Sequence, residues 1–323
     1  MRAVRADSPG GFAREALSTR RICQTHGVFS FRFTLIAAAT LLACDARAAD
    51  APARPRITQE LVDRQPARID ARIRDISEHS PPGAQAYFLG FAGVGEEHVF
   101  AEEIDLAARR LAERFGLEDR SLRLVNDQRD LEKYPLASPR ALKYALHSLG
   151  RIMDDDDVLF LVLASHGWKD ATIAVSNAGE DFEDLPARAL AQMLKESGIR
   201  WRVIVISACY AGSFVKPLAD DHTIVITAAA KNRPSFGCGS DRDLTYFGEA
   251  FWRDALPRAP SLREAFEAAR REITERETDE GERPSHPQGY FGPLMEARLA
   301  ELERRPAPLS RSGHQGSSVA PIR

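Results

Sequence analysis

WRVIVISACYAGSF, at positions 201–214, predicts a buried strand that ends beside a cysteine. Residues 203–207 are β-branched or small, which is the pattern of a strand inside a parallel sheet. Ala208, Cys209 and Gly212 are small residues, of the kind found where a chain leaves a sheet and turns toward a helix. Open α/β sheets bind their ligands at the carboxyl ends of their strands, so Cys209 is a candidate nucleophile. The alternative is an inert buried thiol, because free cysteine is among the most buried residue types.

A second apolar run, VLFLVLA at 158–164, ends in the sequence Ser-His-Gly. If the two runs form neighbouring parallel strands, joined through a helix predicted at 185–197, His166 lies beside Cys209. A cysteine needs a neighbouring base or imidazolium to hold it as a thiolate at neutral pH. The backbone N–H groups of Gly167 and Cys209 are then candidates for an oxyanion site. For His166 the alternative is a structural histidine whose hydrogen bonds are satisfied within the core or a turn.

The rest of the chain alternates between strand and helix patterns, which predicts an α/β fold with a mainly parallel sheet. Gly116 is the predicted stop of one helix, and Ser138 followed by Pro139 is the predicted start of another. The segment at 284–292 is read as a last strand or as a wall of the site. The other predicted strands are 84–91, 121–125 and 223–229, and the other predicted helices are 98–115, 138–149, 244–256, 261–277 and 294–304.

Composition excludes several classes of function. The chain has 323 residues and a formal net charge of −3, which gives no argument for binding to nucleic acid or to an anionic membrane. It has only four cysteines, too few for a disulfide scaffold. No CxxC or HExxH spacing is present, so we expect neither a metal site nor a cofactor. The acidic run at 154–157 lacks the spacing of a calcium loop and is read as a solvated turn.

The first 49 residues read as a signal for export rather than as part of the fold. FTLIAAATLLA at 33–43 follows Arg32 and is too short to span a bilayer, as is typical of a signal-peptide core. Two kinds of processing remain open. One is cleavage at the A-x-A-like site at 46–48. The other is lipidation at Cys44, because the sequence before this cysteine resembles a bacterial lipoprotein box. We therefore expect a protein in the periplasm or anchored by a lipid in the cell envelope.

The remaining boundaries follow from composition. Residues 50–83 are rich in Pro, Arg and Asp and predict a spacer with a short amphipathic helix. The α/β domain is predicted at 84–304. Residues 305–323 are rich in Pro, Ser, Gly and Arg and predict a disordered tail.

ASHGW at 164–168 and SACYAG at 207–212 resemble the legumain-type cysteine peptidases of the caspase-like clan, in their bacterial branch. The likeness covers roughly residues 84–299 and includes TAAAKNRPSFGC at 227–238, TYFGEAF at 245–251 and PSHPQGYFG at 284–292. It implies a caspase-like three-layer αβα sandwich. It also implies peptide-bond hydrolysis through a thioester, by a Cys209/His166 dyad without a third, orienting acid.

The resemblance also implies residues for substrate binding, in a family that prefers Asn and sometimes Asp before the cleaved bond. Ser235 and Asp241 fall on pocket positions of that family. Tyr210 stands where legumain has an acid, and the Arg of an early Arg-His pair is missing near His98, which puts an Asn preference in doubt. An ordinary loop carboxylate remains the alternative for Asp241.

Three functions remain open at this point. The first is a cysteine endopeptidase, and the second is a transamidase or ligase that uses the same acyl-enzyme. The third is a catalytically idle envelope protein that binds peptides in the same groove. The expected partner is a peptide or protein substrate in each case, with no nucleic acid and with a membrane contact only through the lipid anchor.

Overall fold

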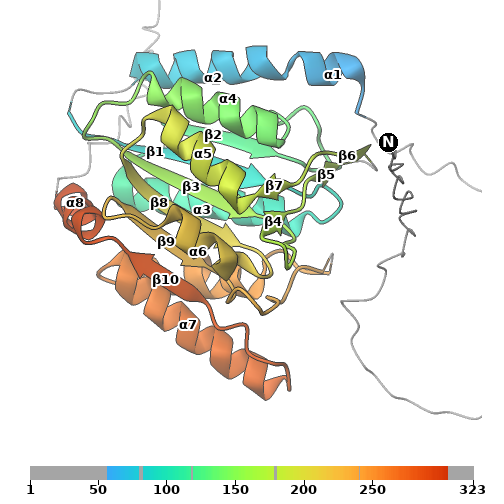
Figure 1. The fold of residues 1–323 in the computed structure, drawn as a ribbon, viewed down its shortest axis with the longest axis vertical. Helices are drawn as coiled ribbons and strands as arrows, with labels where there is room; N and C mark the ends of the chain where they lie inside the picture. The colour runs from blue at the N-terminus through green and yellow to red at the C-terminus, as the bar shows by residue number, and fades with distance from the viewer. Residues whose placement is uncertain (1–56, 80–82, 118, 178–179, 240, 305–323) are drawn as a thin grey trace, which may run out of the picture. The chain divides into compact units, whose positions relative to one another are not determined.

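A sheet of six strands in the order β10-β9-β8-β3-β1-β2 lies at the centre of the domain (Figure 1). The computed structural model describes residues 57–79, 83–117, 119–177, 180–239 and 241–304. All neighbours in the sheet are parallel except β10, which pairs antiparallel with β9 at one edge. The strands are β1 (Ala86–Ala92), β2 (Ser121–Val125), β3 (Val158–Ala164), β8 (Trp201–Ser207), β9 (Thr223–Thr227) and β10 (Gln288–Phe291).

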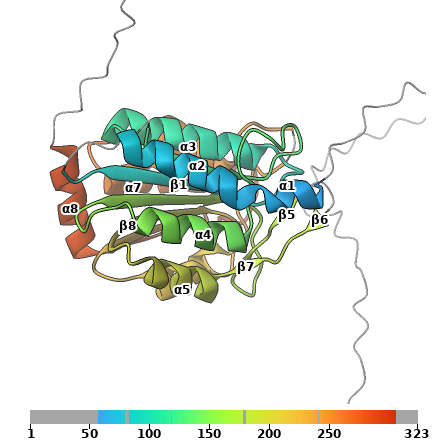
Figure 2. The same cartoon turned by 90° about the horizontal axis from the view of Figure 1, so that it is seen from above.

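Helices cover both faces of this sheet, so the domain has three layers (Figures 1 and 2). One face is covered by α3 (Val99–Phe115), the π-helix η2 (Gly248–Ala255), α7 (Leu262–Asp279) and α8 (Pro293–Glu303). The other face is covered by α2 (Gln65–His79), α4 (Pro139–Gly150), α5 (Ala187–Ser197) and α6 (Val215–Leu218). The predicted three-layer αβα sandwich with a mainly parallel sheet is therefore confirmed.

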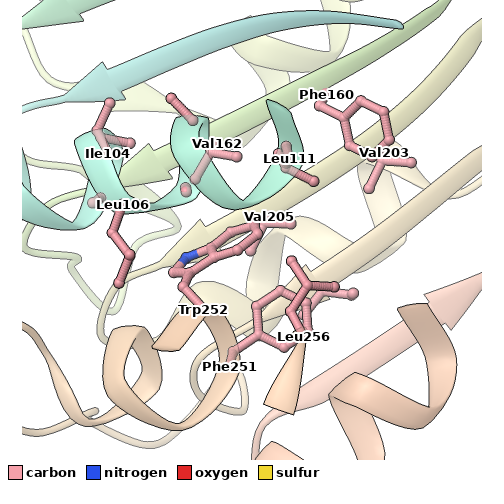
Figure 3. Close-up of a cluster of buried hydrophobic side chains, with 14 of the residues drawn as sticks. Ile104, Leu106, Leu111, Phe160, Val162, Val203, Val205, Phe251, Trp252 and Leu256 are labelled. Atoms are coloured by element: carbon pink, nitrogen blue, oxygen red, sulfur yellow. The ribbon is translucent and has the colours of Figure 1, made fainter. Parts of the chain in front are cut away.

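The core forms because every second residue of a strand points to the same face. In β3, Phe160 and Val162 belong to the apolar cluster under α3 and η2, whereas Leu161 belongs to the cluster under α4 and α5. Figure 3 shows Phe251 and Trp252 of η2 pointing toward the sheet in the first cluster. Both faces of β3 are buried, which explains its continuous apolar sequence.

The helix boundaries read from the sequence are confirmed where a capping residue defines them. The Ser138 side chain accepts a hydrogen bond from the N–H of Ala141, and Pro139 opens α4. Gly116 ends α3 in the left-handed conformation, with φ of 62°, which a residue with a side chain rarely adopts.

The segment between β3 and α5 is more ordered than its polar sequence indicated. It forms two small antiparallel pairs, β4 with β7 and β5 with β6. Their bounds are β4 (Thr172–Ile173), β5 (Ser176–Asn177), β6 (Glu180–Asp181) and β7 (Leu185–Pro186). Because Leu185 and Pro186 pair with β4, the helix expected from residue 185 begins only at Ala187.

Residues 57–79 form two helices, α1 (Gln59–Asp63) and α2, where the sequence predicted a spacer with one short helix. Ile69, Ile73 and Ile76 of α2 are buried in the cluster that also contains α4, at the i, i+4, i+7 spacing of one helix face. This part of the chain is thus packed onto the domain instead of leading up to it.

Several other predictions have different outcomes. The helix expected at 244–256 is a π-helix over a shorter range, and the segment at 284–292 contains β10. Within the described ranges, no helix is long and apolar enough to cross a membrane. The signal segment, its Cys44 and the tail at 305–323 lie outside the described residues, so they stay predictions.

Candidate active site

His166 and Cys209 lie at equivalent places on neighbouring central strands. Strands β3 and β8 pair in parallel, and the last pair in their register is Ala164 with Ser207. His166 and Cys209 are each the second residue beyond that pair, at strands spaced about 4.8 Å apart. The structure therefore brings together the two residues that the sequence placed on separate apolar runs.

Gly167 lies directly against the backbone of Cys209. A Cβ atom at this position would overlap the carbonyl oxygen of Cys209. Gly167 also pairs with Ile173 in an isolated antiparallel bridge. The two hydrogen bonds of this bridge run from the Trp168 N–H to the Thr172 carbonyl and from the Ala174 N–H to the His166 carbonyl. The N–H of Gly167 is thus not used by this bridge, and it lies next to the backbone of Cys209.

The thiol of Cys209 is half-buried and contacts the loop that follows β9. The N–H of Ser235 donates to Cys209 Sγ at 3.3 Å, and Sγ lies 3.5 Å from the Ser235 carbonyl oxygen. The Ser235 hydroxyl lies 3.7 Å from the same sulfur. Ser235, predicted to bind substrate, is therefore a neighbour of the Cys209 thiol.

Glu97 is the residue near His166 that the sequence did not identify. Its Oε2 lies 3.6 Å from His166 Nε2, and this oxygen is buried without a hydrogen bond. The edge of the Phe100 ring packs against the imidazole from the same turn, with ring centroids 5.1 Å apart. Glu97 follows β1, and the crevice between β1 and β3 is where the strand order of the sheet reverses. Open α/β sheets bind ligands at such a crevice, so the two acidic residues after β1 could have been selected from the sequence as candidates, and Glu97 is one of them.

Tyr210 has an unusual backbone conformation. Its φ is 58°, in the left-handed region that non-glycine residues seldom adopt. Its N–H donates to the Arg233 carbonyl at 2.8 Å, and Lys169 Nζ lies 5.9 Å from the centre of its ring. Strained residues of this kind concentrate at functional sites. Here the strain turns the chain sharply just after Cys209.

The other two predicted substrate-binding residues lie on the loop and on the helix start beside it. Asp241 is exposed and adjacent to Gly239, and none of the contacts in the described part of the chain joins it to Cys209 or His166. His98 precedes α3, and its Nε2 lies 3.9 Å from Asp243 Oδ1. The acid that faces His98 is therefore Asp243 and not Asp241.

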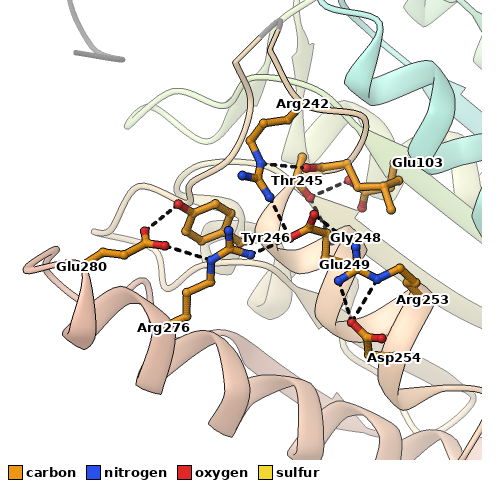
Figure 4. A network of polar contacts seen from close by, with 11 residues as sticks. Glu103, Arg242, Thr245, Tyr246, Gly248, Glu249, Arg253, Asp254, Arg276 and Glu280 are labelled. Carbon is orange, nitrogen blue, oxygen red and sulfur yellow. Dashed lines mark hydrogen bonds and ion pairs between the residues drawn. The ribbon is translucent and has the colours of Figure 1, made fainter. Parts of the chain in front are cut away.

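A polar network holds the end of this loop against η2 and α7 (Figure 4). Glu249 forms ion pairs with Arg242 at 2.7 Å and with Arg276 at 2.5 Å. Both guanidinium groups lie over the ring of Tyr246, whose hydroxyl donates to Glu280 at 2.5 Å. The network therefore ties Arg242, on the loop that also carries Ser235, to η2 and α7.

Glu103 links α3 to the strand that leads to Cys209. It is fully buried, and its carboxylate accepts a hydrogen bond of 2.6 Å from Thr245, whose hydroxyl lies 3.3 Å from that of Ser207. Burial raises the pKa of Glu103 from its usual 4.5 to about 7, despite the hydrogen bond from Thr245. The folded protein therefore holds a proton on Glu103 at pH values where the unfolded chain has released it.

We expect Glu103→Gln to reduce the loss of stability between pH 5 and pH 8. The stability that protonated Glu103 contributes is complete below about pH 4.5 and is lost as the pH rises through about 7. A shift of this size corresponds to roughly 3 kcal/mol in the free energy of unfolding. Glutamine keeps an acceptor for Thr245 and does not ionise. Urea unfolding at both pH values measures the difference, with the partly exposed Glu102→Gln as control. Equal pH dependence in wild type and Glu103→Gln would contradict this assignment.

No group of three or more metal-binding side chains is present among the described residues. Cys209 and Cys238 both carry thiols, so no disulfide joins them.

Residues 142–297 match the model of the Peptidase C13 family. No curated protein matches the chain. The matched segment begins within α4 and includes the ends of β3 and β8, whereas the resemblance in sequence was expected from residue 84.

The fold and this match together define the class of protein, a cysteine peptidase built on a three-layer α/β sandwich. Residues 142–297 belong to the C13 family, which supports a legumain-like assignment. The resemblance seen in the sequence is thereby confirmed at the level of the family.

Proposed function

We propose that the protein hydrolyses peptide bonds with Cys209 as nucleophile and His166 as the group that transfers protons. The observation that carries this proposal is the equivalent place of the two residues, each two positions beyond the pair Ala164 and Ser207. Membership of the C13 family supports a cysteine peptidase in general terms.

The reaction proceeds in two steps. The Cys209 thiol passes its proton to His166 as Sγ attacks the carbonyl carbon of the substrate, and the N–H groups of Gly167 and Cys209 stabilise the negative charge on the carbonyl oxygen. The C–N bond breaks, His166 gives this proton to the leaving amine, and a thioester remains on Cys209. A water molecule then attacks the thioester, with His166 accepting its proton. The C–S bond breaks, and His166 returns the proton to the sulfur, which releases the carboxylic acid and restores the thiol.

In this scheme Glu97 is a positioning residue for His166. Its carboxylate holds the imidazole from the side of β1 and forms an ion pair when the imidazole is protonated. The two side chains are partly exposed, so the ion pair contributes roughly 1 kcal/mol of interaction free energy. A change of about 1.36 kcal/mol in an activation barrier corresponds to a factor of ten in rate.

We expect Glu97→Gln to lower kcat by up to about tenfold, to leave KM nearly unchanged and to shift the pH profile of kcat. Glu96→Gln is the matched control, because the Glu96 carboxylate contacts Ser176 at 2.9 Å. Kinetics of both variants between pH 5 and 8 provide the measurement. An equal fall in kcat in Glu97→Gln and Glu96→Gln would contradict the positioning role of Glu97.

For specificity we propose that the chain cleaves after Asn or Asp. Three features support this: Ser235 lies beside the thiol, Asp241 is on the same loop, and His98 faces Asp243 across the loop. A histidine and a carboxylate together offer a donor and an acceptor to an amide side chain. The residue found before the cleaved bonds in a peptide library tests this proposal directly.

The test of the reaction itself uses the chain from residue 50 onward, which contains every described element and only two cysteines, Cys209 and Cys238. A Cys238→Ala version of this chain is incubated with a peptide library before and after alkylation of its remaining thiol. We expect hydrolysis that alkylation abolishes. Cleavage that survives alkylation overturns the role of Cys209. If an amine is added and the peptide is joined to it instead of being hydrolysed, the result indicates a transamidase. Binding of peptides without cleavage indicates an idle groove.

A further inference from the structure

Trp168 is a large apolar side chain that is exposed beside the candidate active site. It is 45% exposed, and in the described part of the chain only Leu294 is a comparably exposed large hydrophobic residue. Single exposed hydrophobic residues are common on protein surfaces and need no function. The position of Trp168 is what distinguishes it, since it follows Gly167, which packs against the backbone of Cys209.

The ring of Trp168 is held in place although it is exposed. The N–H of Trp168 donates to the Thr172 carbonyl at 2.9 Å, which closes a short hairpin after His166. The indole N–H donates to Asp184 at 3.1 Å, and the second oxygen of this carboxylate accepts from the Val175 N–H at 3.1 Å. A rigid exposed aromatic side chain loses little entropy when it binds a ligand.

Geometry places this ring on the side of the catalytic histidine. Residues 166–168 are an extended arm of the hairpin, because the His166 carbonyl and the Trp168 N–H both pair with its other arm. Side chains two residues apart on such an arm leave it on the same face, about 6–7 Å apart along the chain. The side chains of His166 and Trp168 therefore share a face.

The tip of the hairpin also reaches the turn after the nucleophile. Lys169 Nζ lies 5.9 Å from the centre of the Tyr210 ring. Lys169 at the tip of the hairpin is thus close to the turn that follows β8, while the hairpin itself follows β3. A peptide whose scissile bond lies between His166 and Cys209 would have this hairpin beside it.

We propose that Trp168 determines specificity by binding a large apolar or aromatic side chain of the peptide, within about two residues of the scissile bond. This inference rests on the proposed function and adds a second requirement to the residue before the cut. The indole offers a flat apolar face, and its N–H is already occupied by Asp184, so it selects by contact with apolar groups and not by hydrogen bonding.

The test compares wild type with Trp168→Ala, Trp168→Phe and Leu294→Ala. Substrates are pairs of peptides that differ only in Phe or Ser at each of the two positions on either side of the cut. At one position we expect wild type to prefer Phe, and Trp168→Ala to lower this preference in kcat/KM about tenfold. Trp168→Phe should restore most of it. Leu294→Ala is the matched control, because Leu294 is equally exposed but lies away from Cys209. It is in the first turn of α8, which bonds to Asp221 just before β9 begins, whereas Cys209 follows the carboxyl end of β8. The preference should be unchanged there.

A binding measurement separates this inference from the proposed function. Fluorescence anisotropy follows labelled, uncleaved Phe and Ser peptides on a Cys209→Ala chain, with and without Trp168→Ala. If no chain hydrolyses any peptide but Trp168→Ala still removes the preference for Phe in binding, the proposed function fails and this inference stands. A Phe preference that persists without the indole in both assays overturns the inference. An equal loss for Phe and Ser peptides also overturns it.

Discussion

Cys209→Ala is expected to abolish peptide hydrolysis, with kcat falling on the order of 10⁵-fold or more, because the proposed thioester forms on the sulfur of Cys209. Alanine keeps the small volume required at the end of β8 and removes only the sulfur. The lost contact is that with Ser235, and the half-buried position has room for water. The free energy of unfolding should therefore change little. Steady-state kinetics on the best-cleaved peptide, together with urea unfolding, provide the measurement.

Cys238→Ala is the control for this change. Cys238 is a second partly buried thiol on the same loop and packs against the apolar cluster under α3. Its replacement should keep kcat within about twofold, since a methyl group preserves most of this packing. Residual activity in Cys209→Ala near the wild-type level would show that another residue attacks the substrate. Loss of activity in Cys238→Ala alone would point to that thiol.

Gly167→Ala is expected to lower kcat by about 10² to 10³, the cost typical of losing one donor to an oxyanion. The methyl group would overlap the carbonyl oxygen of Cys209, which is backbone and cannot rotate away. The ends of β3 and β8 must then move apart, and the N–H of Gly167 moves with them. This glycine is required for the space it leaves, since its backbone is not in the left-handed region.

Gly150→Ala separates this catalytic effect from a loss of stability. A methyl group at Gly150 would overlap the Ser197 carbonyl oxygen in the same manner, but it lies where α4 ends and α5 ends. Both variants should unfold at lower urea concentration than wild type. Only Gly167→Ala should lose kcat while folded. If the two variants lose activity to the same degree, Gly167 has no specific role in catalysis.

The central part of the site could be predicted from the sequence because it depends on regular structure. Two apolar runs buried on both faces leave few arrangements other than neighbouring parallel strands. Their ends then bring His166 and Cys209 to one edge of the sheet. Caps such as Ser138 and Gly116 define the helices between the strands by local chemistry. The order of the layers follows from these elements.

The loops that complete the site could not be predicted in this way. Glu97 reaches His166 only because α3 begins two residues later, and no periodic pattern gives the direction of its side chain. Ser235 contacts the thiol from a loop that continues to the ion pair of Arg242 with Glu249, and no periodic pattern gives the course of this loop. In the same loop, matching of motifs pointed to Asp241, whose role in substrate binding stays a prediction, whereas the contact of Asp243 with His98 was not expected. Positions in a loop are not constrained by a repeat, so the sequence does not indicate which of its side chains meet a neighbouring element.

The packing of α2 sets a limit on how far the chain can be shortened from its amino end. A proteolytic cut ahead of Ile57 leaves both amino-terminal helices and their contacts intact. A cut between α2 and β1 would instead detach Ile69, Ile73 and Ile76 from α4 and uncover an apolar strip on a folded enzyme. Such a strip favours self-association. Shortening the chain from its amino end is therefore compatible with the fold only if α2 is kept.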